Sequence, residues 1–287
     1  MPNFKYVINA KRLLEETPFI RKDRLKVALS TIEKDEQGNY SSPSEFITIM
    51  SNIMLNEHLG IELPHIHPFM QYISQDINNI ETITIRLAWE RDLWKTKQLN
   101  VGKWMAFAQC DIDLFQIEMR SILDYVAKII LRIADNQNEV PDKGFNKLKN
   151  WLAKLPENAD KLGKDLAELV SSADWFEDLK NVRDANVHHG GMTIVFLEEG
   201  RILFQTLDGY KNLVTTTPEI MYNENVVDFE LYAGMYFGYL IAFLEEFSAI
   251  IKKRLPKLKV DLKRGNPRKL YSELPIIFQW VDKLNNV

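Results

Sequence analysis

The chain of 287 residues has little of several features that mark particular classes of protein. Its single cysteine, Cys110, excludes an internal disulfide framework and fits a reducing compartment. The 36 basic residues are outnumbered by 40 acidic ones, so the net charge of -4 excludes an overall positive field for nucleic acid. No glycine-rich loop with the spacing of a phosphate cradle is present, which argues against an ATP-binding P-loop.

Long apolar runs are also lacking. The N-terminal residues have no apolar core of the secretory type, and the most apolar stretch, residues 231–244, is shorter than a bilayer-spanning helix. Two glutamates, Glu245 and Glu246, follow this stretch directly. We therefore expect a cytoplasmic protein with no membrane partner and a buried amphipathic helix in this region.

What the sequence does contain is helical periodicity. Hydrophobic residues make up 46% of the chain and charged residues 26%, which are ordinary values for a folded protein. Between residues 104 and 133, apolar residues recur at steps of three, four or seven, which predicts one helix of about 30 residues, roughly 45 Å long. A final long helix is predicted from about 226 to 254. Between them, residues 192–207 alternate around a glycine and predict a β-hairpin.

These patterns predict a mainly α protein organised in three segments. Residues 1–100 form an additional N-terminal helical region of unknown role, in which one helix is predicted from Gln75 to about Leu99. Residues 101–255 form a helical bundle with the one inserted hairpin, and residues 256–287 form a basic C-terminal tail.

The stretch that carries chemistry is "NVRDANVHHGG", residues 181–191. Histidine exchanges protons near neutral pH, and the planar fork of arginine binds phosphate oxygens as negative charge develops on them. Asp184 precedes His188 by four residues, so on a helix it lies on the same face and can orient the imidazole. Arg183 and His188 are five residues apart, so they converge only if the helix ends or kinks between them, or if a second subunit completes the site.

This motif resembles the signature of the HEPN superfamily, which is an arginine, a polar residue, several further residues and a histidine. Arg183, Asp184 and His188 match these positions, and His189 offers an alternative spacing. The order of elements is also similar: a long helix with a polar face, a shorter helix, the helix with the motif, and a last long helix. The resemblance covers about residues 101–255.

The resemblance implies a homodimer in which two motifs face one cleft. It implies RNA cleavage by attack of the ribose 2'-hydroxyl, with no metal and no cofactor, in toxin–antitoxin or antiphage systems. In that activity His188 would act as acid or base, Arg183 would clamp the phosphate, and Asp184 would orient the histidine. The superfamily also contains non-catalytic RNA binders and proteins that bind a protein partner, such as an antitoxin.

Two other interpretations of the motif stay open. Arg183 is equally compatible with a surface charge paired to nearby carboxylates, and the two histidines with an ordinary helix end before the glycines. In that case the chain is a non-catalytic dimerisation or partner-interaction protein.

Polar residues of the long helix are further candidates. Asp113, Arg120 and Asp124 share one helix face, and Glu118 or Asp124 can reach the motif from the neighbouring helix as additional catalytic groups. The structural alternative is an ion pair between Arg120 and Asp124, four residues apart.

The histidines of "HIH", at 65 and 67, have the side chains of a zinc site, but Pro64 and Pro68 favour a rigid loop, and we predict no metal site. The tail concentrates positive charge, so a phosphate backbone is a possible ligand for it. The alternative is a solvated basic face. The candidate RNA-binding residues are Lys252, Lys253, Arg254, Lys257, Lys259, Lys263, Arg264 and Arg268.

Overall fold

The computed structural model describes part of the chain. The described residues are 33–34, 40–41, 45–58, 63–98, 100–188, 193–205, 220–223, 226–258, 276–277 and 279–280. They are mainly helical, as predicted, with one four-stranded antiparallel sheet and one short two-stranded sheet. They belong to two compact units, the first made of 1–75, 121–173 and 240–275, and the second of 76–120, 174–239 and 276–287.

Three long helices contribute residues to both units. They are α4 (His67–Lys95), α5 (Val101–Ile133) and α11 (Phe229–Arg254). The predicted 30-residue helix is confirmed as α5. Its apolar residues at the periodic steps are almost fully buried, and these are Trp104, Ala108, Phe115, Met119, Ile122, Val126, Ile129 and Ile133. The predicted domain boundaries at residues 100 and 255 rest on the sequence pattern and stay predictions.

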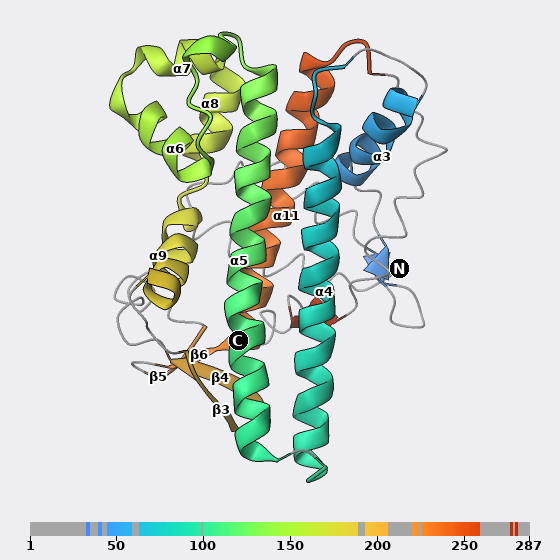
Figure 1. Ribbon diagram of the computed structural model, residues 1–287, viewed down its shortest axis with the longest axis vertical. Helices are drawn as coiled ribbons and strands as arrows, with labels where there is room; N and C mark the ends of the chain where they lie inside the picture. Colours follow the sequence, from blue (N-terminus) through green and yellow to red (C-terminus); the bar gives the residue numbers. More distant parts are fainter. Residues whose placement is uncertain are drawn as a thin grey trace. The chain divides into compact units, whose positions relative to one another are not determined.

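The first unit holds the shorter elements that come before α4 and between α5 and α9 in the sequence. These are β1 (Glu33–Lys34), β2 (Tyr40–Ser41), α3 (Glu45–His58), η1 (Gln137–Glu139), α6 (Phe145–Lys154), α7 (Glu157–Leu162) and α8 (Lys164–Ser171). The helices α6, α7 and α8 form one cluster (Figure 1), in which Phe145 packs edge-on against Phe243 of α11 at 5.7 Å between ring centres. This geometry suits two aromatic quadrupoles.

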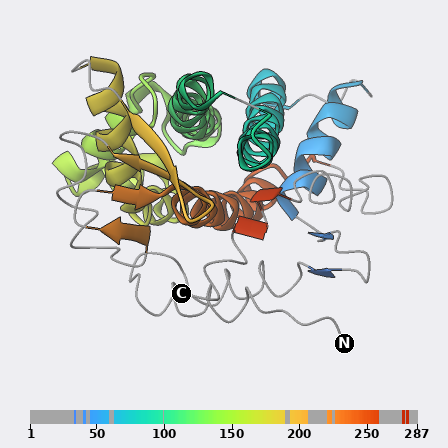
Figure 2. The same cartoon turned by 90° about the horizontal axis from the view of Figure 1, so that it is seen from below.

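The second unit combines helices with the sheet. It contains α9 (Trp175–His188), β3 (Ile194–Glu198), β4 (Arg201–Gln205), β5 (Met221–Asn223) and β6 (Val226–Asp228), besides its parts of α4, α5 and α11. The strand order is β3-β4-β6-β5 and all pairs are antiparallel (Figure 2).

The predicted hairpin is present as β3 and β4. Glu198 pairs with Arg201, so only Glu199 and Gly200 form the turn, and both have positive φ, 50° and 77°. Two successive positive φ values define a type I′ turn, whose twist matches that of the strands, and glycine adopts such a φ without a steric cost.

Two predicted helix starts need correction. The last helix begins at Phe229 rather than near 226, because Val226 and Val227 belong to β6, which pairs with β4. β-branched residues suit a strand better than a helix start. The helix predicted from residue 75 begins at His67, since Pro68 lies in its first turn, where the missing amide of proline is tolerated.

Among the described residues, α11 is the one helix that is long and apolar enough to cross a membrane by those two criteria alone. Of its most apolar window, 83% is buried inside the protein. This burial is that of a core helix, as the sequence predicted.

The start of α11 depends on Asp228. Its Oδ1 accepts hydrogen bonds from the amides of Glu230 at 3.0 Å and Leu231 at 3.3 Å, so it caps the first turn of the helix. We expect Asp228→Ala to lower the free energy of unfolding by about 1–2 kcal/mol, because two buried amides lose their acceptor. Urea denaturation measures this loss. Asp142→Ala, at a carboxylate that is 57% exposed, is the matched control and should cost less than about 0.5 kcal/mol; equal losses would contradict the capping role.

Candidate functional site

The motif lies on α9, a helix of the second unit. Phe176, Leu179 and Val182 are fully buried and fix one face of α9, while Glu177 and Asp178 stand in its first turn, where negative charge suits the helix dipole. Arg183 and Asp184 are at the edge of this buried face, with side chains 22% and 30% exposed.

Asp184 binds two arginines. Its Oδ1 accepts a hydrogen bond from Nη1 of Arg183 at 2.9 Å and from Nη1 of Arg120, on α5, at 2.7 Å. Arg120 is 21% exposed. Arg183 and Arg120 are both partly exposed, and guanidinium groups have the planar donors that bind an anion.

The pKa of Asp184 lies below its ordinary value. Burial alone would raise this pKa, but the hydrogen bonds and charges of Arg183 and Arg120 outweigh that effect. The carboxylate therefore stays ionised and keeps the two guanidinium groups side by side.

The backbone of α9 remains helical through His188. A helix turns by about 100° per residue, so positions 183 and 188 are roughly 140° apart around the axis of α9. The helix does not end between them, so a helix end at this point does not bring the arginine and the histidine together. Their pairing across two chains stays a prediction. The side chain of His188 and the whole of His189 lie outside the described residues.

Glu118, the first additional candidate on α5, belongs to a group with two residues of α4. Its Oε1 accepts a hydrogen bond from the amide of Asn79 at 3.1 Å, and it also contacts the carboxyl group of Asp76. Asp76 is 7% exposed. Burial, the hydrogen bond with Glu118 and the charge of Glu118, in that order, raise the pKa of Asp76 to about 7.

Our sequence analysis missed Asp76. The signal for it was present, because Asp76 interrupts the apolar positions Ile73, Ile77 and Ile80, all fully buried on α4. A carboxyl group among such positions is desolvated, and a desolvated carboxyl group tends to hold its proton.

Asp124, the second additional candidate, has a structural partner in the first unit. Its Oδ1 accepts a hydrogen bond from the amide of Phe145 at 2.7 Å, which caps the start of α6. Gly144 precedes that amide with a φ of 76°, and a Cβ at this position would stand 2.6 Å from the same oxygen. The pairing of Asp124 is therefore with α6, and that of Arg120 is with Asp184. Asp113, on the same predicted face, accepts a hydrogen bond from the hydroxyl of Thr193 at 2.7 Å.

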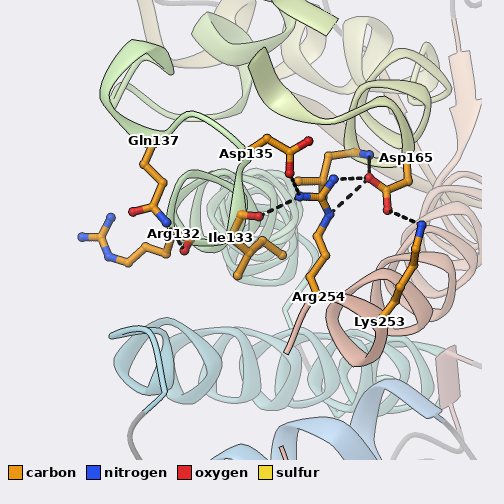
Figure 3. A network of polar contacts seen from close by, with 8 residues as sticks. Arg132, Ile133, Asp135, Gln137, Asp165, Lys253 and Arg254 are labelled. Atoms are coloured by element: carbon orange, nitrogen blue, oxygen red, sulfur yellow. Dashed lines mark hydrogen bonds and ion pairs between the residues drawn. The ribbon is translucent and has the colours of Figure 1, made fainter. Parts of the chain in front are cut away.

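The candidate RNA-binding residues at the start of the basic strip, residues 252–268, differ in their contacts. Some of them bind carboxylates of the protein, and others are exposed. Arg254 donates from Nη1 to Asp135 at 2.7 Å and to the carbonyl of Ile133 at 2.9 Å, and its other nitrogens bind Asp165 (Figure 3). Lys253 also reaches Asp165, at 3.3 Å. Arg254 therefore joins α11 to α8 and to the segment after α5.

The other residues of the strip differ. Lys252 and Lys257 are exposed. Lys259, Lys263, Arg264 and Arg268 lie outside the described residues. The RNA-binding role of the strip stays a prediction.

A cavity of about 620 Å³ lies beside Arg254 in the first unit. Carboxylates predominate among its charged lining residues, which are Asp135, Asp160, Lys164, Asp165, Glu168, Glu246, Lys253 and Arg254. This surplus of negative charge opposes a phosphate backbone. Within the part of the chain that the structure describes, no group of three or more His, Cys, Asp or Glu side chains is arranged to hold a metal ion.

No family model, curated protein or solved structure matches this chain. The likeness to the HEPN superfamily therefore rests on the motif and the order of helices. The described residues around Asp184 are the place from which a function is inferred below.

The raised pKa of Asp76 should make the free energy of unfolding depend on pH. Asp76 stays protonated in the folded protein up to about pH 7, but ionises near its ordinary value of 3.8 when unfolded. Its contribution to stability is therefore fully present below about pH 4 and is lost as the pH rises through about 7. We expect Asp76→Asn, which mimics the protonated carboxyl, to match the wild type at pH 4 and to exceed its stability by roughly 3–4 kcal/mol at pH 8.

Urea unfolding between about pH 4 and pH 8 measures this difference. Glu118→Gln removes the charge that helps to raise the pKa of Asp76, so it should move the pH-dependent loss to lower pH. A difference between Asp76→Asn and the wild type that does not change with pH would contradict the assignment.

Because Arg254 binds two carboxylates and a backbone carbonyl, we expect its substitution to lower the free energy of unfolding. Arg254→Ala leaves the carboxylates of Asp165 and Asp135 without their shared cation, so we expect a loss of about 2–3 kcal/mol. Arg254→Lys should recover only part of this loss, because an ammonium group cannot bind both carboxylates and the carbonyl with the same geometry. Lys257→Ala, at an exposed position, is the control and should leave the urea midpoint unchanged.

Proposed function

We propose that the protein binds RNA at the Arg120–Asp184–Arg183 cluster and cleaves it as a metal-independent endoribonuclease. One observation carries the proposal: two partly exposed guanidinium groups are anchored on one ionised carboxylate, on the helix that also bears His188. Such a cluster suits a phosphodiester, since planar guanidinium groups bind phosphate oxygens in pairs.

In this mechanism the ribose 2'-oxygen attacks the neighbouring phosphorus atom. His188 takes the proton of the 2'-hydroxyl while water gives a proton to the 5'-oxygen as the bond from phosphorus to that oxygen breaks, or His188 and water exchange these two roles. The products are a 2',3'-cyclic phosphate and a free 5'-hydroxyl. Arg183 and Arg120 stabilise the negative charge that grows on the phosphorane oxygens.

The helical geometry favours a homodimer for this activity. Positions 183 and 188 of one chain diverge around α9, so the arginine of one chain and the histidine of another are the natural pair. This agrees with the shared cleft that the HEPN resemblance implies.

A non-catalytic interaction protein is the second candidate. It is favoured by the exposed apolar side chains of α4 and α5, among them Trp89 and Phe107, which are typical of a protein-binding surface. Binding of RNA without cleavage, or of a protein such as an antitoxin, belongs to this alternative.

The test is cleavage of a labelled RNA by the purified chain in the presence of a chelator. We expect cyclic-phosphate ends from the wild type, and a loss of at least about 100-fold in rate for Arg183→Ala and for the functional histidine, His188→Ala or His189→Ala. Arg183→Lys should stay impaired, because the fork of donors is lost. His65→Ala, at an exposed histidine of the first unit, is the control and should retain full activity.

Mixing Arg183→Ala with His188→Ala tests the sharing of the site between chains. Mixed dimers contain one intact pair, so activity should return to about a quarter of the wild-type value or less, depending on chain exchange. Wild type and variants that are equally inactive on RNA would overturn the nuclease proposal.

A further inference from the structure

The cavity beside Arg254 has a buried inner end and an exposed mouth. Its volume of about 620 Å³ is within the range of pockets that hold small molecules. Glu246 and Ile250 of α11 line it and are each 6% exposed, whereas the lining residues Asp160, Lys164 and Glu168 are exposed. All of its lining residues belong to the first unit. A ligand that fills the cavity therefore contacts α11 at the inner end and α7 and α8 at the mouth.

Two cations of the cavity are already bound to two of its carboxylates. Arg254 joins Asp135 and Asp165, and Lys253 also points to Asp165 (Figure 3). Burial raises the pKa of Asp165, but the hydrogen bonds and charge of Arg254 and the hydrogen bond of Lys253 outweigh this and bring the pKa below its ordinary value. These four side chains form one network in which positive and negative charges balance.

The remaining charged groups of the cavity are mostly acidic. Lys164 is the third cation of the lining, and it is 83% exposed and 3.9 Å from Asp160. Against this single cation stand three carboxyl groups, those of Asp160, Glu168 and Glu246. A ligand that enters the cavity therefore meets more hydrogen-bond acceptors than donors, and a positive charge on the ligand is favoured.

The carboxyl groups are too widely spread for a bare metal ion. They extend from the buried Glu246 on α11 to the exposed Glu168 on α8, and among the described residues no group of three or more possible metal ligands is close enough to hold an ion. A single metal ion also needs far less space than this cavity provides.

The wall between the two ends is apolar. Ala249 and Ile250 follow Glu246 by three and four residues on α11, so they lie on the same helix face, and both line the cavity. The matching ligand carries positive groups at its two ends and an aliphatic chain between them.

We propose that this cavity binds a small aliphatic polyamine. One ammonium group donates hydrogen bonds to Glu246 at the inner end, and another donates to Asp160 and Glu168 at the mouth. Each ammonium group has several donors, which suits carboxyl oxygens from two helices. The methylene groups between them lie against Ala249 and Ile250.

This inference goes beyond the proposed function. The cavity belongs to the first unit and the Arg120–Asp184–Arg183 cluster to the second, and the ligand is a small cation rather than RNA. Binding is measured on the chain alone with no RNA present, so this proposal and the nuclease proposal can each fail without the other.

The first test is titration calorimetry of the full chain with spermidine at about 0.15 M salt. We expect one molecule to bind per chain with a dissociation constant of about 0.1 mM or less. Butylamine has the aliphatic chain but one charge, and Mg²⁺ has two charges but no chain. Each of them should bind at least about tenfold more weakly than spermidine.

Variants locate the site through its charges. Glu168→Gln and Glu246→Gln should each weaken spermidine binding by about tenfold, because one end of the ligand loses its negative partner. Glu168 is exposed, so its variant keeps the test valid if Glu246→Gln folds poorly. Lys164→Gln should strengthen binding by about threefold, since it removes a cation from the mouth. Glu157→Gln is the matched control: Glu157 is exposed on α7 but does not line the cavity, and its variant should bind like the wild type.

Hydrogen exchange gives a second readout of the place of binding. Spermidine should slow the exchange of amides in residues 157–171 and 246–254, which include the acidic lining residues of α7, α8 and α11. Exchange in α9, residues 175–188 of the second unit, should not change.

Several outcomes would overturn the proposal. Spermidine that does not bind the wild type would do so directly. Equal losses for Glu157→Gln and Glu168→Gln would show attraction to the overall negative charge of the chain instead of a site. Binding of Mg²⁺ as tightly as spermidine, or of inorganic phosphate in a way that Lys164→Gln weakens, would assign the cavity to another class of ligand.

Discussion

The polar side chains of α5 have to find partners on other elements, and this requirement fixes much of what surrounds the helix. Asp111 binds Arg86 and Glu118 accepts a hydrogen bond from Asn79, both on α4. Arg120 binds Asp184 on α9.

A partly buried charge left without such a contact would lose its hydration with no compensation, so each pair favours one neighbour and one level along the helix. Apolar packing is tolerant of small shifts, whereas these pairs are directional. The cluster at Asp184 therefore holds α9 in place against α5, and it is also the place where we propose that RNA binds.

The regular elements could be predicted from the sequence because their signals are local. The steps of three and four residues along α5 and the alternation around Gly200 depend only on neighbours in the chain. The strand at Val226 and Val227 could not be separated from the following helix in this way, because its identity depends on pairing with β4. The predicted start of α4 was also wrong, because Pro68 lies in the first turn of this helix although proline usually ends a helix.

In the candidate site, too, local features could be predicted from the sequence and long-range contacts could not. The motif residues on α9 were visible in the sequence. The pairings of Arg120 with Asp184 and of Asp124 with Phe145 were not, since they join positions 21 or more residues apart. The run of basic residues in the sequence made Arg254 a candidate RNA-binding residue of the tail. In the structure Arg254 binds the carboxylates of Asp135 and Asp165. Net charge along a segment does not show which cations are already paired, so such a strip has to be judged residue by residue.

The same network makes two distant positions interdependent. Gly163 has a φ of 99°, and a Cβ on it would collide with the guanidinium of Arg254 and approach the carboxylate of Asp135 to 2.7 Å. A larger residue at 163 is thus opposed twice, by a φ that residues with a Cβ rarely adopt and by the space that Arg254 and Asp135 already occupy. The absence of a side chain at 163 is what lets the guanidinium of Arg254 approach the backbone there and bind Asp135 and Asp165 together.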